Sequence, residues 1–134
     1  MIKPVWPGCV GVNKEFLEYL IKEKILLFPW SSQARGFFIK KKEQISNNHF
    51  SNPTLDEEIR VWHYAKNLKR RDKCFELAEK RGLEPIQIAL AYVLHQSDLI
   101  FPLIGPRTIV ETNSSIEASK VELTAKELQE LSQA

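Results

Sequence analysis

Apolar residues three or four positions apart predict helices along most of the chain. Asn13 is placed to cap the first helix, Gly82 ends a later one, and Pro85 begins the next. A Thr-x-x-Glu pattern, the signature of a capping box, marks further helix starts at Thr54, Thr108 and Thr124. Helices are therefore expected over residues 13–24, from 54 to 82, over 85–95, over 108–118 and from 124 onward.

Two apolar runs without helical spacing predict strands. The run from Ile25 to Trp30 has no polar position, which is typical of a parallel strand covered on both faces. A second run from Phe101 to Ile104 leads into a turn at Gly105. Strands joined by helices indicate a βαβ arrangement, so we predict an α/β fold with both strands parallel. Because two strands cannot form a closed or doubly covered sheet, we expect other strands to complete it.

The turn after the second strand is a candidate anion-binding site. Gly105 suits a tight turn, and Thr108 and Glu111 fix the start of the helix. Arg107 lies between the turn and the start of the helix. Backbone N–H groups and the positive end of the helix dipole would then face the same place as the arginine. The spacing also fits an ordinary strand-to-helix connection with a surface arginine, so both interpretations stay open.

A polar loop follows the first strand. Ser31, Ser32 and Gln33 come directly after it, at the carboxyl end of a parallel strand, where α/β proteins bind ligands. A loop capped by its own hydroxyl groups is the alternative. Residues 39–53 are rich in lysine and asparagine, and they form a polar loop that is a candidate lid.

Composition narrows the class of protein. At 134 residues and 43% hydrophobic content, the chain is expected to form one globular domain. No apolar run approaches the roughly 20 residues that a bilayer-spanning helix needs, and no signal pattern is present, so we expect a cytoplasmic protein without a membrane partner. Cys9 and Cys74 lack disulfide-framework or metal-binding spacing. The histidines His49, His63 and His95 also lack it, so no metal site is expected.

The charge pattern does not favour nucleic acid. The formal net charge is only +2, and carboxylates dilute the basic run at residues 66–73, as on a solvated helix face. The helices on either side of Gly82 and Pro85 resemble a helix-turn-helix superficially, but the second helix is too apolar to lie in a DNA groove. We therefore expect no nucleic-acid partner.

Several of these stretches, in the same order along the chain, resemble the aldo-keto reductase family. Residues 30–38, Trp-Ser-Ser-Gln-Ala-Arg-Gly-Phe-Phe, are similar to the end of barrel strand seven and its following loop. Residues 85–94 are similar to the last barrel helix before strand eight. Residues 102–108 and 121–124 resemble strand eight, its cofactor-binding turn and the C-terminal tail. The segment 6–9 resembles the region after strand six in one bacterial branch.

This resemblance implies an α/β fold, a partial (β/α)8 TIM barrel that covers about strands seven and eight with their helices. Residues 1–134 would be the C-terminal portion of an aldo-keto reductase domain, which binds NADP(H) and transfers hydride to an aldehyde or ketone. The implied contacts with the pyrophosphate and ribose come from Ser31, Ser32, Gln33, Arg35 and Gly36. The implied contacts with the adenosine 2′-phosphate come from Gly105, Arg107 and Thr108. Glu111 and Ser115 complete the implied site, where the branch usually has Gln and often has Asn.

The resemblance assigns no catalytic residue to this chain. The family's tetrad of Asp, Tyr, Lys and His belongs to the first half of the barrel, and Tyr19, Tyr64 and Tyr92 all fall on helix patterns. A whole barrel needs about 250 residues. We therefore expect activity only when a complementary N-terminal half supplies the tetrad and the site for a small carbonyl substrate.

The alternative function is a non-enzymatic helical module that binds another protein. It would use open strand edges and the surfaces of Trp6, Trp30 and Trp62. For either function, open sheet edges are expected to favour association of the chain with itself.

Overall fold

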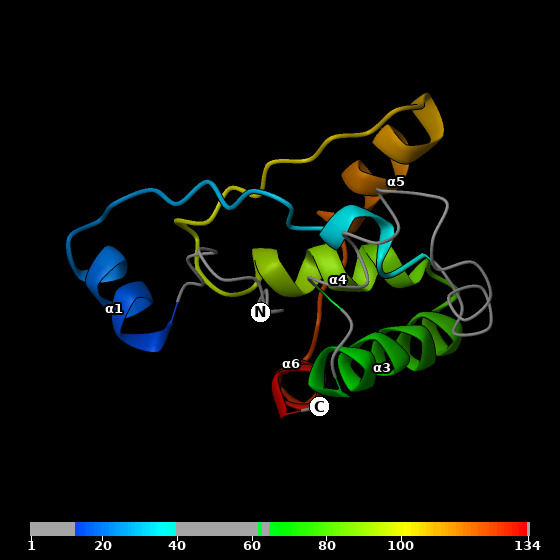
Figure 1. Cartoon of the computed structure of the whole chain (residues 1–134), viewed down its shortest axis with the longest axis horizontal. Coiled ribbons are helices and arrows are strands. Elements are labelled where there is room, and N and C mark those ends of the chain that lie inside the picture. Colours follow the sequence, from blue (N-terminus) through cyan, green and yellow to red (C-terminus); the bar gives the residue numbers. More distant parts are fainter. Residues whose placement is uncertain (1–12, 40–61, 63–64, 134) are drawn as a thin grey trace.

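The computed structural model describes residues 13–39, 62 and 65–133 (Figure 1). Its helices are α1 (Lys14–Lys22), α3 (Ala65–Arg81), α4 (Pro85–Leu94), α5 (Ile109–Ala118) and α6 (Ala125–Gln133), with a short 3-10 turn η1 (Ala34–Gly36). They confirm the helices expected in this part of the chain. None of these helices is long and apolar enough to cross a bilayer. Outside the described residues lie the Thr54 capping box, nearly all of the polar loop at 39–53, and Trp6, Cys9, His49, His63 and Tyr64.

Local capping explains where the helices begin and end. The Asn13 side chain accepts a hydrogen bond from the Phe16 N–H at 2.8 Å, which starts α1. α3 ends at Arg81, and Gly82 follows it with a φ of 65°, which is accessible to glycine without steric cost. This turn lets the Leu83 N–H reach back to the Ala78 carbonyl at 2.9 Å. The helix signals at Asn13 and Gly82 are therefore confirmed.

Two extended segments, residues 25–30 and 99–104, run side by side (Figure 1). A parallel bridge joins Leu27 to Ile100. The Leu27 N–H donates to the Leu99 carbonyl, and the Phe101 N–H donates to the Leu27 carbonyl, both at 2.8 Å. The predicted parallel pairing is confirmed at this bridge, although neither segment forms a longer strand within the described residues.

The prediction that the first segment is covered on both faces is wrong for the described residues. Leu26 is 51% exposed, Phe28 is 54% exposed and Trp30 is 76% exposed. Phe28 stacks on Phe101 of the neighbouring segment, with ring centroids 5.7 Å apart. An apolar run shows that a segment favours burial, but burial also needs a second layer, which the described residues do not provide on this side.

The core lies between α3, α4, the η1 turn and the C-terminal segment. α4 contacts both α3 and α5, and α3 also contacts α6. Ile88 of α4 and Phe37, which follows η1, are fully buried. Val121 and Leu131 from the C-terminal segment belong to the same cluster. α4 is therefore packed between other elements, as its nearly continuous apolar surface predicts.

Arg71 departs from the expected solvated face of α3. Its side chain is 1% exposed, and its guanidinium lies 5.4 Å from the centre of the Phe37 ring, in a cation–π contact. Arg71 shares its helix face with the buried residues Cys74 and Ala78, three and seven positions later. The interpretation of residues 66–73 as a solvated face is therefore wrong at this position.

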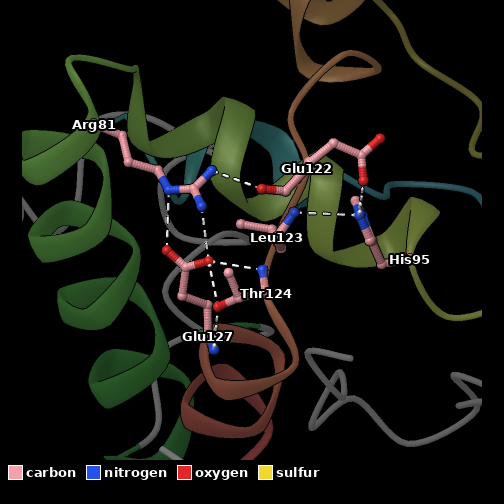
Figure 2. A network of polar contacts seen from close by, with 6 residues as sticks. All are labelled: Arg81, His95, Glu122, Leu123, Thr124 and Glu127. Carbon is pink, nitrogen blue, oxygen red and sulfur yellow. Dashed lines mark hydrogen bonds and ion pairs between the residues drawn. The ribbon is translucent and has the colours of Figure 1, made fainter.

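A polar network fixes the segment between α5 and α6 (Figure 2). The Arg81 guanidinium donates to both carboxylate oxygens of Glu127, at 3.0 and 2.9 Å, and to the Glu122 carbonyl at 2.7 Å. The same carboxylate accepts from the Thr124 N–H at 2.8 Å, which confirms the capping box at the start of α6. Burial raises the pKa of the Glu127 carboxyl, but the Thr124 hydrogen bonds and the Arg81 charge outweigh it and hold the pKa below its usual value.

His95 joins this network from the end of α4 (Figure 2). Its Nδ1 lies 2.8 Å from the Ala91 carbonyl oxygen, and its Nε2 accepts from the Leu123 N–H at 3.3 Å. This pair of hydrogen bonds requires the tautomer that carries its proton on Nδ1. His95 therefore ties α4 to the C-terminal segment.

Candidate functional site

The loop after the first extended segment lies against α5, the helix after the second. The Gln33 side-chain amide donates to the Ser115 hydroxyl at 3.1 Å, across 82 positions of sequence. Gln33 precedes η1, and Ser115 is a buried residue of α5. α5 is also tied to α4, because the Gln87 amide donates to the Ser114 carbonyl at 3.3 Å. The loop after one extended segment and the helix after the other are thereby held at one place.

The loop from Ser31 to Gly36 has an unusual backbone. Ser31 and Ala34 have φ values of 56° and 50°, in the left-handed region that costs a residue with a Cβ roughly 1–2 kcal/mol. Gly36, at a φ of 90°, adopts its conformation without that cost. Ala34 is 2% exposed and Phe37 is fully buried, so packing against the core holds the loop in this shape. Backbone strain of this kind is common where a loop holds a ligand.

Two side chains of this loop, those of Ser32 and Gln33, bond to the protein itself. The Ser32 hydroxyl donates to the Pro29 carbonyl at 2.9 Å, which confirms for this residue the alternative of a loop capped by its own hydroxyl. Ser31 is partly buried, and the Arg35 side chain lies outside the described part of the structure. The backbone of the loop also bonds to itself, because the Ala34 N–H donates to the Ser31 carbonyl at 2.8 Å.

The head of α5, meaning its first turn and the residues just before it, has the expected capping pattern with one change. Thr108 is the N-cap, and its hydroxyl accepts from the Glu111 N–H at 3.1 Å. A capping box predicts that the Glu111 carboxylate reaches back to the N–H of Thr108. The carboxylate accepts instead from the N–H of Arg107, one residue earlier. Glu111 is thereby fixed against the turn that was expected to bind an anion.

The head of α5 is open to solvent. Arg107 is exposed, and Ile109 and Val110 are 79% and 77% exposed. A Cβ placed on Gly105 would meet no heavy atom within 4 Å, so this side of the turn is also open. N–H groups in the first turn of a helix have no partner within the helix, and together with Arg107 they can bind an anion that approaches from solvent.

Two ionisable groups, the buried Cys74 of α3 and the partly buried Tyr92 of α4, pack in or against the core. Burial raises the pKa of the Cys74 thiol to about 12, so the thiol is protonated and unreactive at neutral pH. Burial also raises the pKa of the Tyr92 hydroxyl. Among the residues that the structure describes, no three His, Cys, Asp or Glu side chains lie close enough to hold a metal ion.

Comparison with known proteins identifies the family. The model of the aldo/keto reductase family matches residues 10–134. The chain belongs to the aldo-keto reductase family. Proteins of this family have a (β/α)8 barrel fold.

Its relatives among curated proteins are longer aldo-keto reductases. Norsolorinic acid reductase stcV from Emericella nidulans is 32% identical over 89% of this chain, and probable aldo-keto reductase 1 from Glycine max is 33% identical over 92%. Probable aryl-alcohol dehydrogenase AAD4 from Saccharomyces cerevisiae is 31% identical over 78% of the chain. The matches cover 29%, 36% and 32% of these three proteins, so this aldo-keto reductase chain spans about a third of their length.

Gln87 is a residue of this region that sequence reasoning missed. It is 8% exposed, and its side chain both accepts from the Glu84 N–H at 2.9 Å and donates to the Ser114 carbonyl. The local signal for the first bond was present, because a Gln in the third helical position after an acidic N-cap is typical of a capping box. The second bond depends on how α5 packs on α4, which no local pattern reveals.

Proposed function

We propose that this chain is the cofactor-binding portion of an NADP(H)-dependent aldo-keto reductase and forms about strands seven and eight of its barrel with their helices. The Gln33–Ser115 hydrogen bond carries the proposal, because it joins a loop and a helix to which the family resemblance assigns the cofactor. The parallel bridge between Leu27 and Ile100 supports neighbouring barrel strands. This loop and the turn before α5 follow the carboxyl ends of these segments, the face on which barrel enzymes bind ligands.

The residues present fit a phosphorylated nucleotide with one exception. The exposed Arg107 and the open turn at Gly105 suit an anion that approaches the head of α5. The exception is the Glu111 carboxylate, which carries the same sign of charge as a phosphate. The proposed 2′-phosphate contacts are Gly105, Arg107 and Thr108, with Glu111 and Ser115 beside the phosphate and adenine. The proposed pyrophosphate and ribose contacts are Ser31, Ser32, Gln33, Arg35 and Gly36.

The role of this chain in the reaction would be to bind and orient the cofactor. A bound nicotinamide cofactor supplies the hydride that reduces an aldehyde or ketone. Relatives named as reductases and as an aryl-alcohol dehydrogenase support chemistry between a carbonyl and an alcohol. We propose that a complementary N-terminal half supplies the catalytic tetrad and the substrate site, and that the chain alone is inactive and works in the cytoplasm. The exposed side chains of Leu26, Phe28 and Trp30 would pack against that half.

Calorimetric titration of the chain with NADP⁺ tests this function. We expect Arg107→Ala to weaken binding by about tenfold to a hundredfold, because a charged hydrogen bond to phosphate is lost. Lys120→Ala is the matched control: Lys120 is an exposed cation just after the other end of α5, paired with Glu117 at 2.7 Å, and its loss should leave the affinity unchanged. Absence of binding to the unmodified chain would overturn the proposal. Equal weakening by Lys120→Ala and Arg107→Ala would overturn the placement of the phosphate.

One observation favours a second function, that of a non-enzymatic interaction module. The apolar side chains of Leu26, Phe28 and Trp30 are all more than half exposed, and exposed apolar patches mark protein-interaction sites. The discriminating result would be no affinity for NADP⁺ together with a stoichiometric protein complex that Phe28→Ser abolishes. Sedimentation of the chain with and without that substitution would also show whether the surface drives self-association.

A further inference from the structure

The carboxylate of Glu111 occupies the end of α5 at which the proposed function places the 2′-phosphate. Glu111 bonds within this turn through both its backbone and its side chain. The Glu111 N–H donates to the Thr108 hydroxyl at 3.1 Å, and the Glu111 Oε2 accepts from the Arg107 N–H. The N–H of Arg107 belongs to the same turn that would donate to a phosphate, so an anion from within the chain already uses one donor of the site.

This arrangement favours one class of nucleotide over another on electrostatic grounds. The positive end of the α5 dipole, equivalent to roughly half an elementary charge, is partly neutralised by the Glu111 carboxylate. A 2′-phosphate would carry up to two negative charges to the side of that carboxylate and would compete with it for the Arg107 N–H. A free ribose 2′-hydroxyl is neutral and can donate a hydrogen bond to the carboxylate, so it meets no such repulsion.

We infer that Glu111 is a selectivity residue, which disfavours nucleotides with a 2′-phosphate relative to the same nucleotides without one. The inference rests on the proposed function, because it takes the head of α5 as the place where the adenosine ribose binds. Arg107 and Glu111 then act in opposition: Arg107 attracts the 2′-phosphate, and Glu111 reduces that advantage. The chain should consequently discriminate less between NADP(H) and NAD(H) than its exposed arginine alone would predict.

Glu111→Gln separates the charge from the hydrogen bond. The glutamine carbonyl oxygen can still accept from the Arg107 N–H, while the negative charge is removed. The effect of one unit charge about 5–6 Å from a phosphate, at the intermediate dielectric of a protein surface, corresponds to roughly a tenfold change in affinity. We therefore expect Glu111→Gln to raise the affinity for the 2′-phosphorylated nucleotide by about tenfold, and to leave the affinity for the unphosphorylated one nearly unchanged.

The probes are adenosine 2′,5′-bisphosphate and adenosine 5′-monophosphate, titrated calorimetrically into the chain. They differ only in the 2′-phosphate and need neither the nicotinamide nor the rest of a barrel. Glu117→Gln is the matched control, because it removes the same charge from the exposed far end of α5, where Glu117 pairs with Lys120. Glu111→Asp keeps the charge and should keep the selectivity of the unmodified chain. Raising the salt concentration should shrink the difference between Glu111→Gln and the unmodified chain, since exposed charges are screened.

The outcomes distinguish this inference from the proposed function. If the chain binds both probes and Glu111→Gln leaves their affinity ratio unchanged, the selectivity role is wrong and the cofactor site stands. A shift of similar size in Glu117→Gln would also overturn the role, because it would reflect net charge alone. If neither the unmodified chain nor Glu111→Gln binds either probe, the proposed cofactor site itself is wrong and the inference falls with it. Circular dichroism of each variant checks that α5 is still formed.

Discussion

Replacing Arg81 with alanine should destabilise the fold. Arg81 connects α3 to the C-terminal segment through the bidentate pair with Glu127 and the bond to the Glu122 carbonyl (Figure 2). The two charged side chains are 30% and 16% exposed, so the pair is only partly screened by water. The substitution removes all three hydrogen bonds and leaves Glu127 with Thr124 as its partner.

The magnitude follows from this geometry. An exposed ion pair contributes about 0.2–1 kcal/mol, and the bidentate geometry with the added carbonyl bond contributes about 1 kcal/mol more. We expect Arg81→Ala to lower the free energy of unfolding by about 1–2 kcal/mol. Unfolding entropy of about 2.1 cal/mol/K per residue then gives a decrease in Tm of about 4–7 °C for a chain of this length.

The pH dependence provides an independent check. The folded pKa of Glu127 lies below its unfolded value, so its contribution to stability is present above the unfolded pKa and is lost as the pH falls through the folded pKa. The difference in free energy of unfolding between the unmodified chain and Arg81→Ala should therefore shrink as the pH falls from about 5 towards 2. What remains at low pH should be the contribution of the neutral Glu122 carbonyl bond.

Urea and thermal unfolding, followed by far-ultraviolet circular dichroism at pH 7 and below pH 4, measure both quantities. Lys80→Ala is the control. Lys80 pairs with Glu76 at 2.6 Å, but both side chains are largely solvated, at 63% and 47% exposed, so no measurable loss is expected. The reasoning is refuted if Arg81→Ala is no more destabilising than Lys80→Ala, or if its effect is the same at pH 7 and at low pH.

Two further results are expected from other parts of the molecule. Gln33→Ala removes the bond to Ser115 and should weaken nucleotide binding several-fold in calorimetry, with helix content unchanged. Gln96→Ala, which removes a bond to the Tyr92 carbonyl four positions earlier, should leave nucleotide binding unchanged. Cys74 should react with iodoacetamide only as fast as the chain unfolds. Burial raises the pKa of its thiol to about 12 in the folded chain, whereas the pKa is near 8.5 in the unfolded chain. The free energy of unfolding should therefore fall above about pH 9 in the unmodified chain and fall less in Cys74→Ala.

The helices were predictable because their signals are local. Asn13 and Thr124 each cap a helix through a hydrogen bond to a residue three positions later, a distance at which sequence pattern and structure coincide. The parallel pairing of Leu27 and Ile100 was also predictable, since an apolar run joined to another by helices has few other arrangements. Burial was less predictable. Phe28 has the pattern of a core residue but is exposed, because burial depends on what lies opposite.

The candidate site was predictable in its parts and not in its assembly. The sequence and the family resemblance singled out Gln33 and Ser115 separately, but only the fold shows that they contact each other. Arg71 illustrates the same limit in the core, where a charged residue is buried over an aromatic ring although the next residue, Asp72, is exposed. The roles of these site residues in cofactor binding stay a prediction until nucleotide titrations are made.

The 82-position separation of Gln33 and Ser115 has a consequence for the order in which the molecule folds. α3 and α4 are neighbours in sequence and pack against each other, so their contact closes only a short loop and can form early. The Gln33–Ser115 contact must wait until both distant segments are fixed, since closing a longer loop costs more entropy. It should therefore form late in folding and open early in native fluctuations, with fast amide exchange around it. A nucleotide bound across this contact would slow that opening and would thereby stabilise the region around it.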